Sequence, residues 1–367
     1  MKKLYYSTFI LIILFSSCGG EKIDNSFNDG FNRQELLSFV TDSIIIPSHT
    51  NLSTKLNKLS ESINSFCENT NENELDNVRN DWIDAYLNWQ YVEMFNIGKA
   101  EEIYYWQRMN TYPCNESIIN SNIDQQNYDF SSSNYSSFTS QGFPTMGYML
   151  YGLGGDSTQV LSHFTGTNMN KYKLYLQALV SEMIDNTNDV NLFWDNNRSD
   201  FISSSGNTAS SSLNMLTNDF IYYYEKGFRA HKIGIPAGHY SSAPYPQNVE
   251  SYYKRDLCKS LTLNSLQACK SFFIGESFNS SNTGVSLKDY LEYLPEFNDL
   301  SNLIISHLDI AKEKILLLED DFVYQINTNN MMMLSAFDAI QEVVVMLKTE
   351  MLSGIGIQVD YLDADGD

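Results

Sequence analysis

The stretch LSAFDAIQEVVVMLKTEM, residues 334–351, decides the fold class. Its apolar side chains recur in steps of three and four, which places them on one face of an α-helix. Residues 300–318, 36–46 and 172–184 follow the same pattern. We find no series of segments with the alternating pattern of strands. The sequence therefore predicts an all-α body of long helices that each bury one face, for which a bundle is the economical packing. The stripe in the quoted stretch consists of Leu334, Phe337, Ile340, Val344, Leu347 and Met351.

Two loops divide the expected helices. Residues 121–141 are polar and rich in Ser and Asn, and residues 234–249 carry three prolines. A softer break lies near residues 154–170, where we place a domain boundary. The prediction is an N-terminal helical bundle over residues 35–155 and a C-terminal helical bundle over residues 156–367.

The N-terminus has the pattern of an export signal. Lys2 and Lys3 precede the apolar run YYSTFILIILF, which is too short to span a bilayer comfortably. The run ends in Ser-Ser-Cys-Gly, which resembles a bacterial lipobox and implies cleavage before Cys18 and lipid on its thiol. We expect residues 1–17 to be a lipoprotein signal peptide and residues 18–34 to be a lipidated Cys and flexible tether. The alternative is an ordinary secretory signal with a chance Cys.

Composition limits the class of partner. The formal net charge is −22, and 43% of the residues are hydrophobic, which is enough for a real core. Nucleic-acid phosphates would repel such an acidic body, so we exclude nucleic acid as a partner. The charge suits cations, or it is simply the surface of a soluble acidic protein.

Four cysteines follow Cys18, at positions 67, 114, 258 and 269. Cys258 and Cys269 would lie about 16 Å apart along one continuous helix, which is too far for a disulfide between them. The spacings do not match zinc-binding patterns. Free buried thiols are the favoured interpretation, although an exported protein could oxidise them.

Four stretches in order resemble one family. They are Ile44-Ile45-Ile46-Pro47, the segment from Trp82 to Gly98, KIGIP followed by VESYY at residues 249–253, and the terminal GIGIQVDYLDADGD. Together they resemble the imelysin-like proteins, also filed as a peptidase family, over roughly residues 35–367. The resemblance implies two helical bundles with a site at their interface, a lipid anchor in the cell envelope, and a part in iron uptake.

The hallmark of that family is Gly-x-His-x-x-Glu at the start of a helix. The matching stretch here keeps the glycine as Gly142, but Pro144 stands at the His position and Gly147 at the Glu position. A His and a Glu three apart can share a metal or a proton on one helical face, whereas Pro and Gly offer no side-chain ligand, acid or base. Pro in a first helical turn costs little, so the replacement preserves the helix start. The nearby Tyr148 is a poor base because its pKa lies near 10.

The rest of the expected site centres on Glu93. Trp82, Trp89 and Glu93 are spaced to form one helical stripe, so Glu93 needs a partner on a buried or half-buried face. The resemblance places Glu93 at the interface between the bundles; the alternative is the edge of one bundle, paired with Arg108 or Arg229. Glu250 is expected in the first turn of a helix, where a carboxylate interacts favourably with the free N–H groups. Capping of that helix is therefore at least as good an interpretation as ligand binding.

These considerations yield a list of ligand-binding candidates and three candidate functions. The candidates are Glu93, Gly142, Pro144, Gly147, Tyr148, Arg229 and Glu250; we predict no catalytic residue, no metal ligand and no resident cofactor. The first function is a non-enzymatic lipoprotein of the cell envelope, anchored in the outer membrane. It would act with iron-uptake partners and have iron or haem as its transported ligand. The alternatives are a metallopeptidase of the imelysin type and a surface adhesion or scaffold lipoprotein.

Overall fold

The computed structural model describes residues 29–359, and within them it is all-α, as predicted. No strand occurs in this range; one isolated bridge joins Glu276 and Thr283. The expected signal peptide, Cys18 and most of the tether, and the terminal DADGD stretch, lie outside the described residues.

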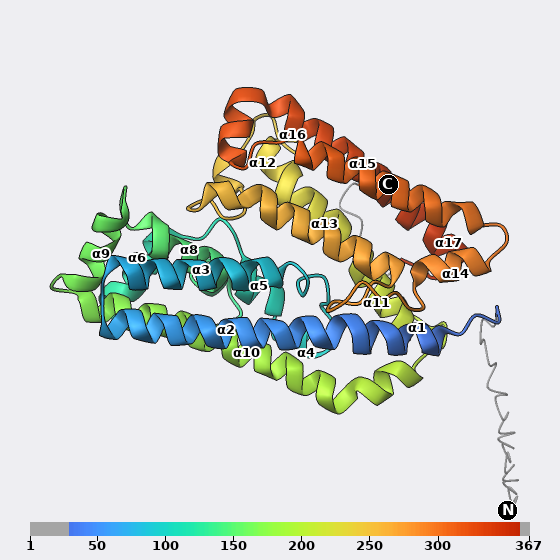
Figure 1. Ribbon diagram of the computed structural model, residues 1–367, viewed down its shortest axis with the longest axis horizontal. Helices are drawn as coiled ribbons and strands as arrows, with labels where there is room; N and C mark the ends of the chain where they lie inside the picture. The colour runs from blue at the N-terminus through green and yellow to red at the C-terminus, as the bar shows by residue number, and fades with distance from the viewer. Residues whose placement is uncertain (1–28, 360–367) are drawn as a thin grey trace, which may run out of the picture.

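The N-terminal group of helices begins with a continuous helical rod, made of α1, η1 and α2, and ends with α10, the longest helix in the described range (Figure 1). The rod lies against α3 and α10, and α9 packs on α3 and α10. The members of this group are α1 (Arg33–Val40), η1 (Thr41–Ile45), α2 (Ile46–Glu68), α3 (Glu72–Trp89), α4 (Lys99–Glu102), α5 (Tyr105–Asn110), α6 (Glu116–Gln125), α7 (Tyr135–Phe138), α8 (Gly142–Gly147), η2 (Tyr148–Gly152), α9 (Ser157–Thr165) and α10 (Met169–Ser203).

The C-terminal group forms a second layer above the first (Figure 1). Within it, α15 packs on α13, α14 and α16, and η3 packs on α16. Its members are α11 (Ser212–Tyr222), η3 (Tyr223–Gly234), α12 (Ile235–Ala237), η4 (Pro246–Asn248), η5 (Arg255–Leu257), α13 (Cys258–Ile274), α14 (Leu287–Tyr293), α15 (Asn298–Leu316), α16 (Phe322–Val345), η6 (Met346–Met351) and α17 (Leu352–Gly354).

The helices α9 and α10 lie beyond residue 155 in the chain but pack on α2 and α3. Both helices are therefore grouped here with the N-terminal helices that they contact. The division into two domains at residue 155 stays a prediction.

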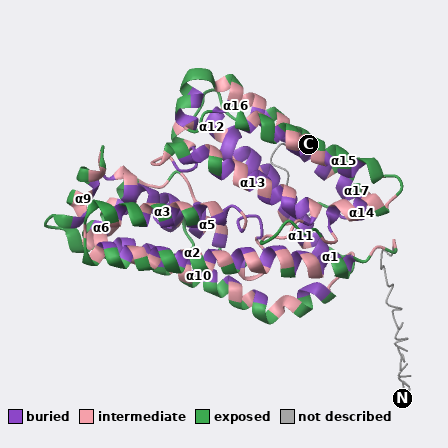
Figure 2. Cartoon of the chain, viewed as in Figure 1, coloured by how far each residue is buried: buried purple, intermediate pink, exposed green. Residues whose placement is uncertain are grey.

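The quoted stretch forms the end of α16 and the turn η6. Five members of its apolar stripe are buried, and Leu334 at its start is half-buried. Phe322–Gly354 is also the one described segment long and apolar enough to cross a membrane, and 44% of its most apolar window is buried inside the protein. Within this segment Phe337, Ile340 and Val343 are buried, and Figure 2 shows buried positions along α16 and α13.

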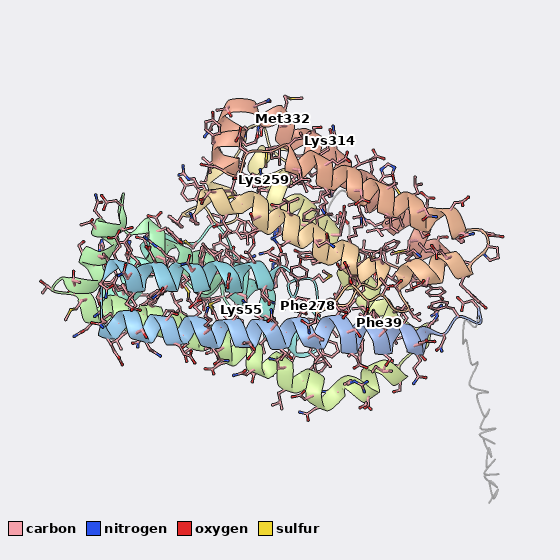
Figure 3. All side chains as sticks on the ribbon, in the orientation of Figure 1. Phe39, Lys55, Lys259, Phe278, Lys314 and Met332 are labelled. Carbon is pink, nitrogen blue, oxygen red and sulfur yellow. The ribbon has the colours of Figure 1, made fainter. Side chains whose placement is uncertain are left out.

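Pro47 lies inside the first rod, just after the π-helical turn η1. A proline in a helix interior cannot bond the carbonyl four residues earlier, here that of Ser43. The Ser43 carbonyl instead accepts a hydrogen bond from the backbone N–H of Phe278 at 2.8 Å. Phe278 belongs to the C-terminal group and lies beside the rod (Figure 3). The proline thus frees a backbone acceptor that joins the two groups of helices.

All four cysteines within the described range are free thiols, in line with the favoured interpretation. Cys258 and Cys269 are buried on one continuous helix, α13, and Cys67 and Cys114 are half-buried.

Candidate functional site

A buried group of charged side chains lies where the two groups of helices meet. The Lys232 ammonium is 2.7 Å from Oε2 of Glu250 and 3.2 Å from Oε2 of Glu93. All three side chains are at most 3% exposed. Glu93 therefore faces the interface, as the resemblance implied, and its partner is Lys232 rather than Arg108 or Arg229.

Neutral donors complete the surroundings of the two carboxylates. Glu93 Oε1 accepts from Asn110 Nδ2 at 2.8 Å and from Trp106 Nε1 at 2.9 Å, and Glu93 Oε2 accepts from the Tyr223 hydroxyl at 2.9 Å. Glu250 Oε1 accepts from Asn110 Nδ2 at 2.8 Å and from Gln90 at 3.1 Å. Each carboxylate oxygen thus has a partner, which is the condition for burying such charges at tolerable cost.

Three separate elements position Gln90, Glu93, Asn110 and Lys232. Gln90 and Glu93 lie in the turns that follow α3, where the Glu93 N–H donates to the Trp89 carbonyl at 2.9 Å. Asn110 ends α5, and Lys232 lies on the π-helical segment η3. A π-helical register shifts side chains relative to an α-helix and occurs often at functional sites.

Glu250 differs from the prediction. No helix begins there: Glu250 follows η4 in a turn, and the next long helix, α13, begins at Cys258. Its carboxylate accepts from Lys232, Gln90 and Asn110 rather than capping a helix. The expected helix start was wrong because the proline-rich loop continues through short turns before regular helix resumes.

The electrostatic surroundings keep Lys232 charged. Burial lowers the pKa of Lys232, but the charges and hydrogen bonds of Glu250 and Glu93 outweigh it, so the pKa is raised overall. Burial, reinforced by the charge of Glu93, raises the pKa of Tyr223 far above its ordinary value. Burial lowers the pKa of His231, although Glu93 opposes the change. The site therefore presents a permanent ammonium, a neutral phenol and a mostly neutral imidazole near neutral pH.

The segment from Gly142 to Gly147 forms α8, as predicted, with Pro144 in its first turn. Gly142 has φ of +74°, and a Cβ there would lie 2.3 Å from the Met109 carbonyl oxygen. The glycine is thus required for α8 to approach the end of α5, which carries Trp106 and Asn110.

Pro144 and Gly147 do not reach the charged group. They line a cavity of about 20 Å³, together with Trp82, Tyr112 and Tyr252. A Cβ at Gly147 would lie 3.1 Å from the Trp82 ring, so the space for a larger side chain is already tight. The segment contributes to the charged group indirectly, through Phe143.

Phe143 connects α8 to the charged group. Its ring stacks on Tyr86 with centroids 4.5 Å apart, and the Tyr86 hydroxyl donates to Asn110 Oδ1 at 2.6 Å. Asn110 in turn donates to both Glu93 and Glu250. The helix start thus orients the amide that joins the two carboxylates.

Two open hollows lie beside the charged group and share Trp106 and Gln107; we call them together the Trp106 cleft. The smaller, about 220 Å³, is lined by Trp106, Gln107, Asn110, Thr111, Tyr112 and His231. The larger, about 450 Å³, extends to α11 and is lined also by Asn96, Glu101, Asn218, Asp219 and Tyr222. The walls of the Trp106 cleft come from both groups of helices. In its wall the His231 ring stacks on the Trp106 ring, with centroids 5.3 Å apart. Two residues that donate to Glu93, Trp106 and Asn110, line the cleft.

Comparison with known families identifies the chain's relatives. The model of the Imelysin family, Peptidase M75, matches residues 45–347, which is most of the chain. The chain belongs to the imelysin family. The resemblance on which the fold and site were predicted is thereby confirmed. A search of curated proteins gives no match.

Solved structures support the imelysin fold. An imelysin-like protein from Psychrobacter arcticum superposes with a TM-score of 0.69 at 15% identity, covering 90% of this chain and 97% of that one. A protein from Parabacteroides distasonis described as an iron-regulated protein A precursor gives a TM-score of 0.72 at 16% identity, covering 86% and 93%. At these identities the likeness concerns the fold alone.

Two other residues predicted for the imelysin site lie elsewhere. Arg229 is 3.5 Å from Glu225 on its own helix and lies over the Phe337 ring. The Tyr148 hydroxyl bonds with the Asn120 side chain, and burial raises its pKa. Sequence reasoning missed Gln90, Trp106, Asn110, Tyr223 and Lys232. For Lys232 alone a signal existed, since it is a charge within the KIGIP segment that carries the resemblance.

The residues present do not fit a catalytic zinc, the metal that a peptidase of this kind would imply. Such a site takes three protein ligands and keeps an open position. Over residues 29–359, no three His, Cys, Asp or Glu side chains are grouped to hold a metal ion. Glu93 and Glu250 are engaged by Lys232, and Pro144 and Gly147 supply no side-chain ligand.

Proposed function

We propose that this imelysin-family chain is a non-catalytic lipoprotein of the cell envelope that binds an iron-containing ligand, iron or haem, in the Trp106 cleft. Cys18 would carry the lipid anchor, in the outer membrane, and iron-uptake proteins would be its partners. The lipobox-like Ser-Ser-Cys-Gly supports the anchor. The relative described as an iron-regulated protein A precursor supports a connection to iron.

The observation that carries the proposal is the internal neutralisation of Glu93. A general base needs a carboxylate free to take a proton within reach of the reacting group. Here both oxygens of Glu93 are held by Lys232, Tyr223, Asn110 and Trp106. Such a carboxylate orients its neighbours, and the cleft beside it favours binding over bond cleavage.

Trp106 provides the test. Trp82, Trp89 and Trp194 are at most 1% exposed, whereas Trp106 is half-buried in the cleft wall. A ligand that contacts the cleft wall should therefore quench the fluorescence of Trp106. We expect full-length protein in detergent to show saturable quenching by haem or by ferric citrate.

Replacing Trp106→Ala should weaken that binding by about tenfold or more, because an aromatic wall residue contributes roughly 1.5 kcal/mol or more of contact energy. Binding by the variant can be followed from the absorbance of haem. The proposal is wrong if neither probe binds the native protein, or if the variant binds with unchanged affinity.

A further inference from the structure

Lys232 occupies the centre of a hollow lined by oxygen atoms. Its ammonium is 2.7 Å from Gln90 Oε1, 2.7 Å from Glu250 Oε2 and 3.2 Å from Glu93 Oε2. The side chain is fully buried, so no water competes for these acceptors from outside. Gln90 and Glu93 come from the N-terminal group of helices, and Glu250 comes from the C-terminal group.

The side chains that face Lys232 are also held by groups other than Lys232, in Glu250 through its other carboxylate oxygen, Oε1. Glu93 accepts from Trp106, Asn110 and Tyr223, and Glu250 accepts from Asn110 and Gln90. Ser265 Oγ donates to Gln90 Oε1 at 2.6 Å. The acceptors should therefore keep their places if the ammonium is withdrawn.

We propose that Gln90, Glu93 and Glu250 form a cation-binding site whose occupant is built into the chain as the Lys232 ammonium. When that ammonium is removed, the site takes a soluble cation, either a primary alkylammonium or a hard divalent metal ion. Carboxylate and amide oxygens are the ligands that hard cations prefer, and they are also the acceptors that suit an ammonium.

The net charge of the buried group favours a cation-binding site over a lysine with a purely structural role. Two buried carboxylates surround one ammonium, so the group carries a formal charge of −1 that only neutral donors offset. Without Lys232 that charge would be −2 in a buried place, and an isolated buried charge is strongly unfavourable. A cation of suitable size should therefore enter. The inference concerns the buried charged group and goes beyond the proposed ligand of the Trp106 cleft.

The test is chemical rescue of Lys232→Ala in the full-length protein. Alanine keeps Cβ, so n-propylammonium supplies the missing Cγ, Cδ, Cε and ammonium. We expect propylammonium or Ca²⁺ to raise the midpoint of thermal unfolding of the variant saturably, by about 3 °C or more, because a ligand that binds only the folded state stabilises it. The native protein should not respond, since its site is occupied.

Two controls separate charge from filling of space. Propanol has the size of propylammonium without its charge and should have a much smaller effect. Lys55→Ala removes a half-exposed lysine paired with Asp84 and should show no cation response. Adding Glu93→Gln to Lys232→Ala removes one anionic ligand and should weaken the cation response.

If Lys232→Ala does not fold alone, refolding from urea is followed by circular dichroism with and without the probes. Recovery of helical signal with propylammonium or Ca²⁺, but not with propanol, supports the inference. The inference is overturned if no cation stabilises or refolds the variant, or if propanol works as well. This measurement does not involve haem binding by the native protein. A failure of the cation-site inference can therefore be distinguished from a failure of the proposed function.

Discussion

Replacing Glu93→Ala should destabilise the protein by about 3 kcal/mol. The change leaves Lys232 paired with Glu250 and Gln90, so no buried charge becomes isolated. The side chains of Trp106 and Tyr223 lose their acceptor, and the Asn110 amide loses one of its two carboxylate acceptors. The Lys232 ammonium loses one of its two anionic partners. Each of the three lost hydrogen bonds costs about 1 kcal/mol, and the cost of about 3–5 kcal/mol for an isolated buried charge is not added because Lys232 keeps Glu250.

Urea unfolding followed by circular dichroism measures this loss of stability. We expect a lower midpoint with an unchanged slope, which indicates a change in stability rather than in the unfolded state. Asp42→Ala is the matched control, because Asp42 forms an ion pair with Arg198 in which both side chains are more than one third exposed. Such exposed pairs contribute at most about 1 kcal/mol. A loss below about 1 kcal/mol for Glu93→Ala would refute the buried network as we describe it.

Three further predictions concern other parts of the chain. Burial lowers the pKa of His49 from 6.5 to about 4, so the unfolded state binds a proton more readily than the folded state. The contribution of His49 to stability should be complete above pH 6.5. The free energy of unfolding should fall by up to about 3 kcal/mol as the pH drops to 4. His49→Gln should flatten that dependence in urea titrations, and an unchanged slope would contradict the assignment. Gly142→Ala should lower the free energy of unfolding in urea by about 2–3 kcal/mol, since φ is +74° and the new Cβ meets the Met109 carbonyl. The control Gly155→Ala should cost less than about 0.5 kcal/mol, because the nearest atoms to its new Cβ lie at 3.8 Å. Equal costs would show that the close approach at Gly142 is not needed. Cys18→Ser should release the protein from membranes, and a variant that still sediments with membranes in high salt would show that the lipobox assignment is wrong.

Much of the helical architecture could be predicted because helical periodicity is a local property of the sequence. The stripe from Leu334 to Met351 indicated a core helix without knowledge of any other segment. The π-helical turn before Pro47 was not predictable in this way. The Ser43 carbonyl in this turn accepts from the Phe278 N–H, which comes from a different part of the chain.

The site was predictable only in part for the same reason. The spacing of Glu93 from Trp89 indicated a buried acid that needs a partner, but periodicity does not say which cation supplies it. The structure supplies Lys232 from η3, while Arg108 instead donates to carbonyls within the N-terminal group, including that of Ile103. A partner brought together by tertiary packing leaves no mark in the local pattern of either segment.

The most direct test of the account is hydrolysis of an unfolded protein substrate by the purified full-length protein, with zinc or iron added. The account predicts no metal-dependent hydrolysis above that of the Glu93→Gln variant, because Glu93 is held by Lys232 and its neighbours rather than free to act. Metal-dependent cleavage by the native protein that disappears in Glu93→Gln, while the variant remains folded, would contradict it.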